Sequence, residues 1–430
     1  MSTKNIVSGI AVVLLGATVA GTAVLGVEVH ERYSGLRHAP AYQLQEPQQL
    51  VLPADDPANL VEVDAAATAA ALQAAAENPA MATLHGRVTD ATTGQTVWES
   101  NADVPLTPAS STKILTAAAA VLTLDPGRTI ATEVVAGPYP GSVVIRAAGD
   151  VWLDDSALDE LAAELGEGVD QVIVDTSAWS GPALAEGVEA DNVDGGYIAP
   201  MQPAMINAAR LGGDEGDLPR SHTPALDVAR ALADRLGAAT VGEGPAPAGA
   251  KVLAAVESPP LSARAEEMVK WSDNVMAEAI AREVATARGA EASFPGAAQA
   301  TLDTLSEAGF DVSGVTLADN SGMSTLNLIP PALLDEIVLR AATEPQLRPL
   351  LGALPVASGV GTLESRYDGL DGRGWVRAKT GTLTGVNALV GTVTGESGHV
   401  YTFALLSNGG ADTLATRRAL DEFASVLRNA

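Results

Sequence analysis

The sequence predicts an α+β fold, in which helices flank an antiparallel sheet and a smaller α/β lobe is inserted into the domain. Strand-like runs occur near both ends of the chain, at residues 82–89, 95–100, 375–382, 387–394 and 399–407. Short turns separate several of these runs, which favours antiparallel pairing. Between them, residues 138–255 change to short strands and helices with frequent glycine and proline, which indicates a separate lobe.

The chain divides into four parts on these grounds. Residues 1–30 are a membrane anchor or signal segment, residues 31–60 are a Pro- and Gln-rich linker, residues 61–137 with 256–430 form the main domain, and residues 138–255 form the inserted lobe. The stretch 6–27 is apolar and uncharged, and its roughly 22 residues can cross a bilayer. We favour an uncleaved anchor over a cleaved signal peptide, and either one places the rest of the chain outside the cytoplasm.

Helix periodicity and helix-favouring composition recur throughout the two folded parts. An Ala-rich helix is expected first, and the strand pair 82–89 and 95–100 surrounds a turn with Gly94, as in a β-hairpin. A helix over residues 411–427 would cover one face of the sheet. The helices expected in order are 65–77, 114–124, 156–165, 225–236, 275–286, 296–308, 331–342 and 411–427, and 172–174 is a short buried strand.

Composition excludes several classes of function. The net charge is −28 with no compensating basic run, so a nucleic-acid partner is not expected. The chain has no cysteine, and its five histidines lack metal-ligand spacing, so neither a thiolate nucleophile nor a metal site is predicted. Only five of the 25 basic residues are lysines, and Lys113 and Lys379 are two of them. Lysine is required where a site needs an amine that can lose its proton, because arginine stays protonated.

The first candidate motif is Ser110-x-x-Lys113, which comes directly before the apolar, Ala-rich run 114–122. A buried helix there would bring the Ser110 hydroxyl and the Lys113 amine onto one face, since residues three apart are neighbours. Burial and the positive helix end disfavour a protonated lysine, and a neutral lysine can accept the serine proton. Taken alone, the pattern equally describes an ordinary helix-start serine with a lysine nearby.

Two further patterns follow along the chain. Ser272-Asp273-Asn274 precedes the helix expected at 275–286, where a hydroxyl and an amide share one side of a tight turn, although the same residues also suit a helix cap. Lys379-Thr380-Gly381 lies in a strand-like run, where it could equally be an edge-strand lysine beside a glycine. The order S-x-x-K, S-D-N, K-T-G, each in its proper context, is the motif set of penicillin-binding proteins and class A β-lactamases.

The chain resembles the class C low-molecular-mass penicillin-binding proteins, D-alanyl-D-alanine carboxypeptidase/endopeptidases of the peptidase S13 type. The resemblance covers nearly everything after residue 60 and includes the segments 108–113, 148–150, 258–261, 270–274, 319–324, 361–363 and 378–385. It implies a penicillin-binding/β-lactamase-like transpeptidase domain with extra material between the first two motifs. The insertion looks shorter than in larger members, and Asn320 and Met323 stand where glycine and leucine are common.

The resemblance also implies a role for each motif residue in a serine-type D-Ala-D-Ala carboxypeptidase without a cofactor. Ser110 would be the nucleophile, Lys113 the general base, and Ser272 the group that passes a proton to the departing amine. The groups that would hold the substrate are Asn274 for its amide, Lys379 with Thr380 for its terminal carboxylate, Gly381 for close approach of its backbone, and the N–H groups of Ser110 and Thr382 for the oxyanion.

The partners implied are peptidoglycan stem peptides, β-lactams as covalent inhibitors, and the membrane through the N-terminal segment. Two other functions stay open from the sequence alone. A β-lactamase or esterase could use the same fold and motifs with faster release of the acyl group. A catalytically inactive, wall-binding protein could retain the motifs without the chemistry.

Overall fold

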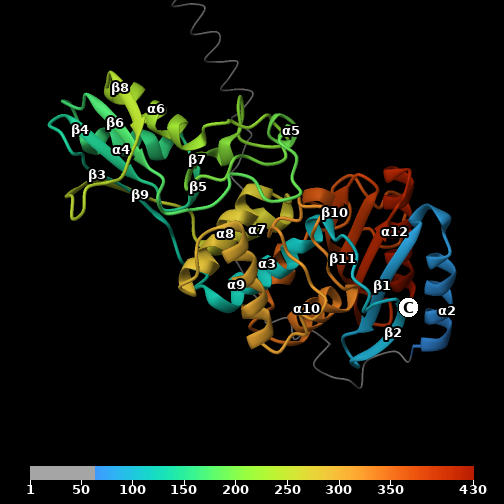
Figure 1. The fold of residues 1–430 in the computed structure, drawn as a ribbon. Helices are drawn as coiled ribbons and strands as arrows, with labels where there is room; N and C mark the ends of the chain where they lie inside the picture. Colours follow the sequence, from blue (N-terminus) through green and yellow to red (C-terminus); the bar gives the residue numbers. More distant parts are fainter. Residues whose placement is uncertain (1–62) are drawn as a thin grey trace, which may run out of the picture. The chain divides into compact units, whose positions relative to one another are not determined.

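A computed structural model of the chain describes residues 63–430, and the predicted membrane segment therefore lies outside the described residues (Figure 1). The first sheet joins both ends of the described chain, because strand β1 pairs antiparallel with β12. All its neighbouring strands are antiparallel. In order across the sheet they are β10 (Val376–Leu383), β11 (Val386–Thr394), β12 (Val400–Asn408), β1 (Thr83–Asp90) and β2 (Gln95–Ser100).

Helices cover both faces of this sheet, and its side chains alternate between them as the period of a strand requires. Leu389 of β11 and Phe403 of β12 lie in the core formed with α2 (Ala65–Ala76) and α12 (Thr413–Val426). The residues that alternate with them, Val390 and Ala404, lie in the larger core on the other face. That core is formed with α3 (Lys113–Thr123), α8 (Asn274–Ala287) and α10 (Pro331–Thr343), among other elements.

A second five-stranded sheet is built from the chain between α3 and α7 (Leu261–Lys270). Parallel pairs link β4 to β6 and β6 to β8, while β3 pairs antiparallel with β4 and β9. α4 (Asp155–Leu165) and α6 (Pro224–Leu236) share its apolar core. The strand order is β8 (Thr240–Glu243), β6 (Gln171–Asp175), β4 (Ser142–Arg146), β3 (Ala131–Ala136) and β9 (Val252–Glu257).

The borders of this second sheet differ from the borders expected for the lobe. β3 begins at Ala131, ahead of residue 138, and β9 ends at Glu257, beyond residue 255. The frequent glycine and proline by which the sequence marks the lobe begin only after β3, at residues 137–141. The division into a main domain and an inserted lobe stays a prediction, with borders that would move to the ends of this sheet.

The remaining elements connect the two sheets or extend the helical layer. β5 (Asp150–Leu153) and β7 (Ala204–Ile206) form a parallel two-stranded sheet. The other helices are α5 (Asp191–Asp194), α9 (Phe294–Glu307) and α11 (Pro349–Ala353). The α+β class is confirmed, and the helices expected from periodicity are present with ends that differ by a few residues. Within residues 63–430, no helix has the length and apolarity needed to cross a membrane.

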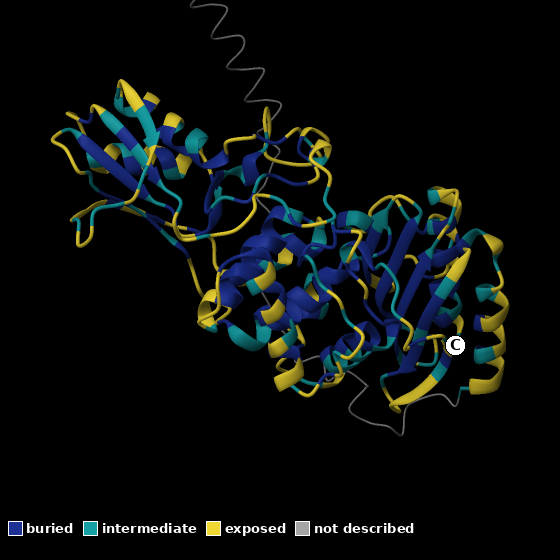
Figure 2. Cartoon of the chain, viewed as in Figure 1, coloured by how far each residue is buried: buried dark blue, intermediate teal, exposed yellow. Residues whose placement is uncertain are grey.

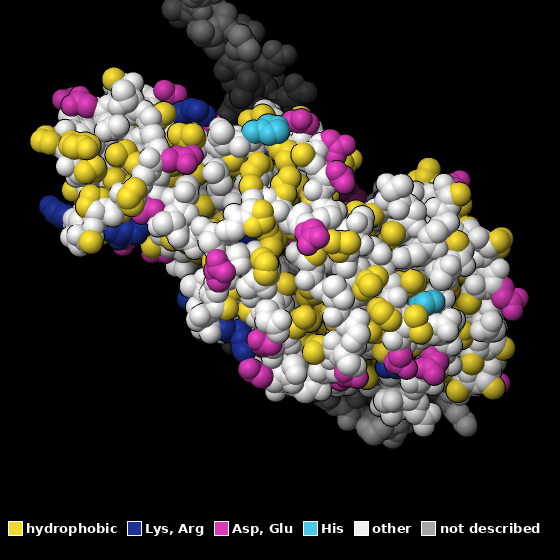
Figure 3. Space-filling view, in the orientation of Figure 1, with side chains coloured by type: hydrophobic (Ala, Val, Ile, Leu, Met, Phe, Trp, Pro, Cys, Tyr) yellow, Lys and Arg dark blue, Asp and Glu magenta, His cyan; other side chains and the backbone are white. Residues whose placement is uncertain are grey.

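Burial and charge follow the sequence pattern. Figure 2 shows the strands β10 to β12 and the helix α3 as largely buried, whereas α2 exposes one side to solvent. On the face drawn in Figure 3, Asp and Glu side chains are scattered and Lys and Arg side chains are sparse, in line with the net charge of −28. A site for an anionic group therefore needs cations placed locally.

Candidate active site

Ser110 lies in a short 3₁₀ turn, Ala109–Thr112, and not in the first turn of the α-helix that follows. The helix α3 begins at Lys113. Ala109 has a φ of 48°, a left-handed conformation that is rare for a residue with a side chain. Backbone conformations of this kind persist where the surroundings enforce them, and they cluster at functional sites. The pattern predicts Ser110 in the first turn of this helix, which is wrong, because the helix begins only at Lys113.

Lys113 is fully buried, and its amine has three polar partners. The Nζ atom lies 3.0 Å from Ser110 Oγ, 2.5 Å from Asn274 Oδ1 and 2.6 Å from the backbone oxygen of Ser321. Burial lowers the pKa of Lys113 to about 8, and the charges of Asp319, Asp273 and Glu278 oppose that fall. An amine with this pKa is neutral in roughly one molecule in ten at pH 7, far more often than an ordinary lysine.

The turn over residues 319–324 holds the carbonyl that Lys113 contacts. Glu278 Oε1 accepts hydrogen bonds from the backbone N–H groups of Asn320 and Ser321, at 2.8 and 2.7 Å. Gly322 has a φ of 83°, and a Cβ there would lie 1.9 Å from the Ala109 oxygen. Only glycine therefore lets this turn pack against the turn that carries Ser110.

The S-D-N segment brings a second lysine beside a second hydroxyl. Ser272 has a φ of 63°, and its Oγ accepts a hydrogen bond from Lys379 Nζ at 2.9 Å. Lys379 is fully buried and also donates to the Thr380 carbonyl at 2.8 Å. Burial, with a contribution from the charge of Lys113, places the pKa of Lys379 well below its ordinary value.

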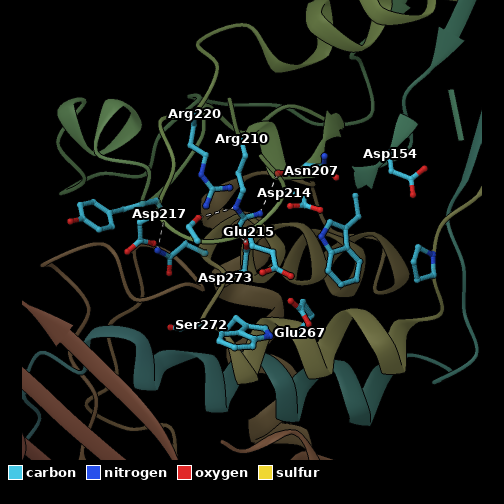
Figure 4. Close-up of a pocket in the computed structure, with 16 residues that line it drawn as sticks. Asp154, Asn207, Arg210, Asp214, Glu215, Asp217, Arg220, Glu267, Ser272 and Asp273 are labelled. Carbon is cyan, nitrogen blue, oxygen red and sulfur yellow. Dashed lines mark hydrogen bonds and ion pairs between the residues drawn. The ribbon is translucent and has the colours of Figure 1, made fainter. Parts of the chain in front are cut away.

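Residues of the segment between β6 and α6 contact the S-D-N turn. Asn274 Nδ2 donates to the Tyr197 carbonyl at 2.8 Å, so both ends of the Asn274 amide are occupied by the protein. Arg210 Nη2 lies 2.8 Å from Asp273 Oδ2, and these two residues line a cavity of about 580 Å³ that has Ser272 at its edge (Figure 4). The charges of Arg220 and Arg210 lower the pKa of Asp273 in spite of its burial, so this carboxylate stays ionised.

The cleft in front of Ser110 has a volume of about 710 Å³ and is lined by all three motifs. Thr380 Oγ1 donates to Thr362 Oγ1 at 2.9 Å, which links the K-T-G strand to the segment that the sequence marked at residues 361–363. The lining residues are Ser110, Asn192, Tyr197, Asp217, Trp271, Ser272, Asn274, Met323, Thr362, Ser365, Arg366, Thr380, Thr382, Leu383, Thr384, Thr413 and Arg417.

Two K-T-G residues lie differently from what the resemblance implies. Lys379 does not line the cleft and reaches it only through Ser272, so a direct contact with a substrate carboxylate does not fit this arrangement. Gly381 is buried, and a Cβ there would lie 2.7 Å from the Pro108 oxygen and 3.2 Å from Ala109 Cβ. Because Gly381 has no side chain, strand β10 can pack closely against the turn that carries Ser110. Gly381 does not make room for a ligand in the cleft.

The structure adds residues that motif spacing did not single out. Ser321 and Tyr197 act through backbone carbonyls, which leave no signature in a sequence. Arg417 contacts Thr382 from the C-terminal helix, 35 residues away along the chain. Glu278 follows Asn274 by four residues, and this spacing puts both residues on one face of the helix. Of the residues that motif spacing missed, Glu278 is the one whose place near the site this spacing could have predicted.

Comparison with known proteins assigns the chain to a family. Residues 68–216 and 214–429 match the family described as D-Ala-D-Ala carboxypeptidase 3 (S13). The chain belongs to this family. It is 43% identical to carboxypeptidase DacB of Mycolicibacterium smegmatis, with 99% of this chain and 97% of the relative covered. It is 28% identical to a D-alanyl-D-alanine carboxypeptidase of Actinomadura sp., with 77% and 79% covered.

A solved structure supports the fold independently. The crystal structure of penicillin binding protein 4 (dacB) from Haemophilus influenzae superposes with a TM-score of 0.71 at 23% identity, and covers 86% of this chain and 99% of that one. As an S13 protein, the chain is a penicillin-binding D-alanyl-D-alanine carboxypeptidase. Its site of action is the cell wall, outside the cytoplasm.

Proposed function

We propose that the chain hydrolyses the terminal D-Ala-D-Ala bond of peptidoglycan stem peptides through an acyl-enzyme on Ser110, with Lys113 as the general base. The observation that carries this proposal is the set of partners around the Lys113 amine. Asn274 Oδ1 and the Ser321 carbonyl oxygen can only accept hydrogen bonds, whereas the Ser110 hydroxyl can donate one.

This difference supports proton transfer from the Ser110 hydroxyl to the Lys113 amine. A neutral amine has two hydrogens and one lone pair. The two hydrogens satisfy Asn274 and Ser321, so the lone pair is directed at Ser110, at a distance of 3.0 Å. Ser110 Oγ then attacks the carbonyl carbon of the penultimate D-alanine as its proton passes to Lys113 Nζ.

The second half of acylation releases the terminal D-alanine. The carbon–nitrogen bond breaks as the departing nitrogen takes a proton from the Ser272 hydroxyl, and the proton held on Lys113 restores that hydroxyl. Lys379 acts here as a positioning residue, because its amine donates to Ser272 Oγ at 2.9 Å and it does not line the cleft. Asn274 holds the Lys113 amine in the free enzyme and becomes available to the substrate amide only if its bond to Tyr197 opens.

The strand β10 supplies the groups for the substrate backbone. Thr380 and Thr382 line the cleft. As the resemblance implies, we assign the oxyanion hole to the backbone N–H groups of Ser110 and Thr382. A donor of this kind is typically worth about 3 kcal/mol to the transition state. Water then attacks the ester on Ser110, Lys113 again takes the proton, and the shortened stem peptide leaves.

Incubation with a labelled penicillin, followed by peptide mapping, tests the proposal. We expect a long-lived adduct on the peptide that contains Ser110, no adduct in Ser110→Ala, and release of D-alanine from a pentapeptide by the unmodified enzyme only. Rapid release of hydrolysed drug would instead identify a β-lactamase. Adduct formation without any D-alanine release would refute the carboxypeptidase chemistry, and a cross-linked muropeptide dimer supplied as substrate tests for additional endopeptidase activity.

We also propose that residues 1–30 anchor the enzyme at the outer face of the cell membrane. The support is the uncharged apolar stretch 6–27, followed by the linker of residues 31–60. Deletion of residues 1–30, with a replacement signal peptide, should move the enzyme from the membrane fraction to the soluble fraction. If the enzyme expressed with its native N-terminus is instead recovered in the soluble fraction, cleaved near residue 20, residues 1–30 contain a signal peptide.

A further inference from the structure

The cleft needs a cation for an anionic ligand, and its two lysines do not supply one. Lys113 and Lys379 are fully buried and absent from the cleft lining. Among the described residues, the cations that line the cleft are Arg366 and Arg417. The substrate in the proposed function carries a carboxylate on the residue that leaves, directly beside the bond that breaks.

Arg366 already has a carboxylate partner. Its Nη2 and Nε atoms contact the two oxygens of Asp421 at 2.6 and 3.0 Å, in the paired geometry that suits a guanidinium and a carboxylate. Both side chains are largely buried. This pair is therefore electrically balanced and serves to connect the segment after residue 361 to α12.

Arg417 has no carboxylate partner among the described residues. It lies on α12 four residues before Asp421, but Asp421 is engaged by Arg366. Its Nη2 atom donates to Thr382 Oγ1 at 3.0 Å, which turns the guanidinium toward the K-T-G strand inside the cleft. Arg417 is half-buried, and a guanidinium that donates to one neutral partner has further N–H donors for a ligand. Burial and the neighbouring Arg366 lower the pKa of Arg417 from its ordinary value, and the charge of Asp421 offsets this only in part.

We propose that Arg417 binds the C-terminal carboxylate of the substrate, together with the Thr380 and Thr382 hydroxyls, and thereby makes the enzyme selective for peptides with a free terminal carboxylate. The inference rests on the proposed function and names the group that recognises its substrate. It assigns to Arg417 the contact that the motif resemblance gave to Lys379. A guanidinium fork matches a carboxylate with two parallel hydrogen bonds, which an ammonium cannot do.

A two-by-two comparison of enzyme and substrate charge tests the proposal. The substrates are an acylated tripeptide that ends in D-Ala-D-Ala and the same peptide with a C-terminal amide. Arg417→Gln should lower kcat/KM for the acid by roughly 10- to 100-fold, the range for a lost hydrogen bond to a charged group, and leave kcat/KM for the amide unchanged. Arg417→Lys should give an intermediate loss for the acid.

Arg418→Gln is the matched control, since Arg418 is the next residue on α12, is exposed and pairs with Glu422. It should leave both substrates unaffected. Equal losses of acid and amide hydrolysis in Arg417→Gln would show a structural role and overturn the proposal, as would no loss for either. If the unmodified enzyme hydrolyses neither peptide, the proposed function itself fails, which is a different result from a loss of selectivity.

Discussion

The two buried lysines, Lys113 and Lys379, form the most informative comparison within the molecule. Each is fully buried, and each places its amine about one hydrogen bond from a motif hydroxyl, at 3.0 Å from Ser110 Oγ and 2.9 Å from Ser272 Oγ. Their electrostatic surroundings differ. Asp319, Asp273 and Glu278 oppose the effect of burial on Lys113, whereas the charge of Lys113 adds to the effect of burial on Lys379.

The difference separates the two roles. Burial and the charge of Lys113 both lower the pKa of Lys379, and no carboxylate opposes that fall, so burial favours its neutral form. In that form Lys379 holds Ser272 through a hydrogen bond and adds no charge to the site. Lys113 retains enough basicity to accept a proton and is neutral often enough to do so, which is the compromise that general-base catalysis requires.

Replacing the base should have the largest effect. Lys113→Arg should lower the rate of acylation by a labelled penicillin by about 10²- to 10⁴-fold, because the base is lost although the positive charge is kept. Lys113→Met serves as a second variant, because a methionine side chain fits the buried space of Lys113 more easily than an arginine side chain does. Labelling at the normal rate in either variant would refute the base assignment, and thermal unfolding measured in parallel shows whether the fold is retained.

Removing the other lysine should cost less. Lys379→Met leaves Ser272 Oγ without its donor, and we expect a loss of acylation rate of roughly 10- to 100-fold. The pH at which the rate rises should stay the same, because the charges that shift the pKa of Lys113 come from Asp319, Asp273 and Glu278 and not from Lys379. A loss as large as that of Lys113→Arg, or a shifted pH profile, would show that the roles of the two lysines are not separate.

The unmodified enzyme should reveal the basicity of Lys113 directly. Its pKa of about 8 means that the neutral, reactive form grows as pH rises. The acylation rate should therefore increase about tenfold between pH 7 and pH 9 and level off above that range. Stopped-flow measurement with a chromogenic β-lactam follows this rise. A rate independent of pH from 6 to 9 would mean that another group acts as the base.

Sequence order predicted much of the site because each motif uses local geometry. Ser110 and Lys113 are three residues apart, and this spacing brings their polar atoms together whether the turn is 3₁₀ or α. The fold class followed in the same way from strand and helix periods. The border of the predicted lobe was harder to place, because glycine and proline become frequent only at residues 137–141, after β3 (Ala131–Ala136) has ended.

Other parts of the site depend on contacts between distant segments, which one sequence does not encode locally. Arg417 and Thr382 meet only because α12 packs beside the sheet. The role implied for Gly381 depended on which side of β10 meets the Ser110 turn, and its close neighbour is the Pro108 oxygen. Ser321 contributes a backbone oxygen, so its side-chain identity carried no information about Lys113.

The smallest predicted effect concerns Glu278, which distinguishes the surroundings of Lys113 from those of Lys379. Glu278 is fully buried, holds the N–H groups of Asn320 and Ser321, and pairs with Arg282 at 3.3 Å. Burial, together with the nearby Asp319, raises its pKa to about 7. Once ionised, its charge favours protonated Lys113 and so raises the pKa of that amine.

Glu278→Gln keeps an oxygen for the two N–H groups and removes the charge. The pH at which the acylation rate rises should fall by less than about one unit. The maximal acylation rate should fall a few-fold, because the Ser321 carbonyl is held less firmly. Glu307→Gln, an exposed residue paired with Arg288, is the control and should change neither. If the plateau rate falls but the pH at which the rate rises stays the same, Glu278 has a purely structural role. The reason is that the charge of Glu278 raises the pKa of Lys113, whereas its hydrogen bonds hold the turn over residues 319–324.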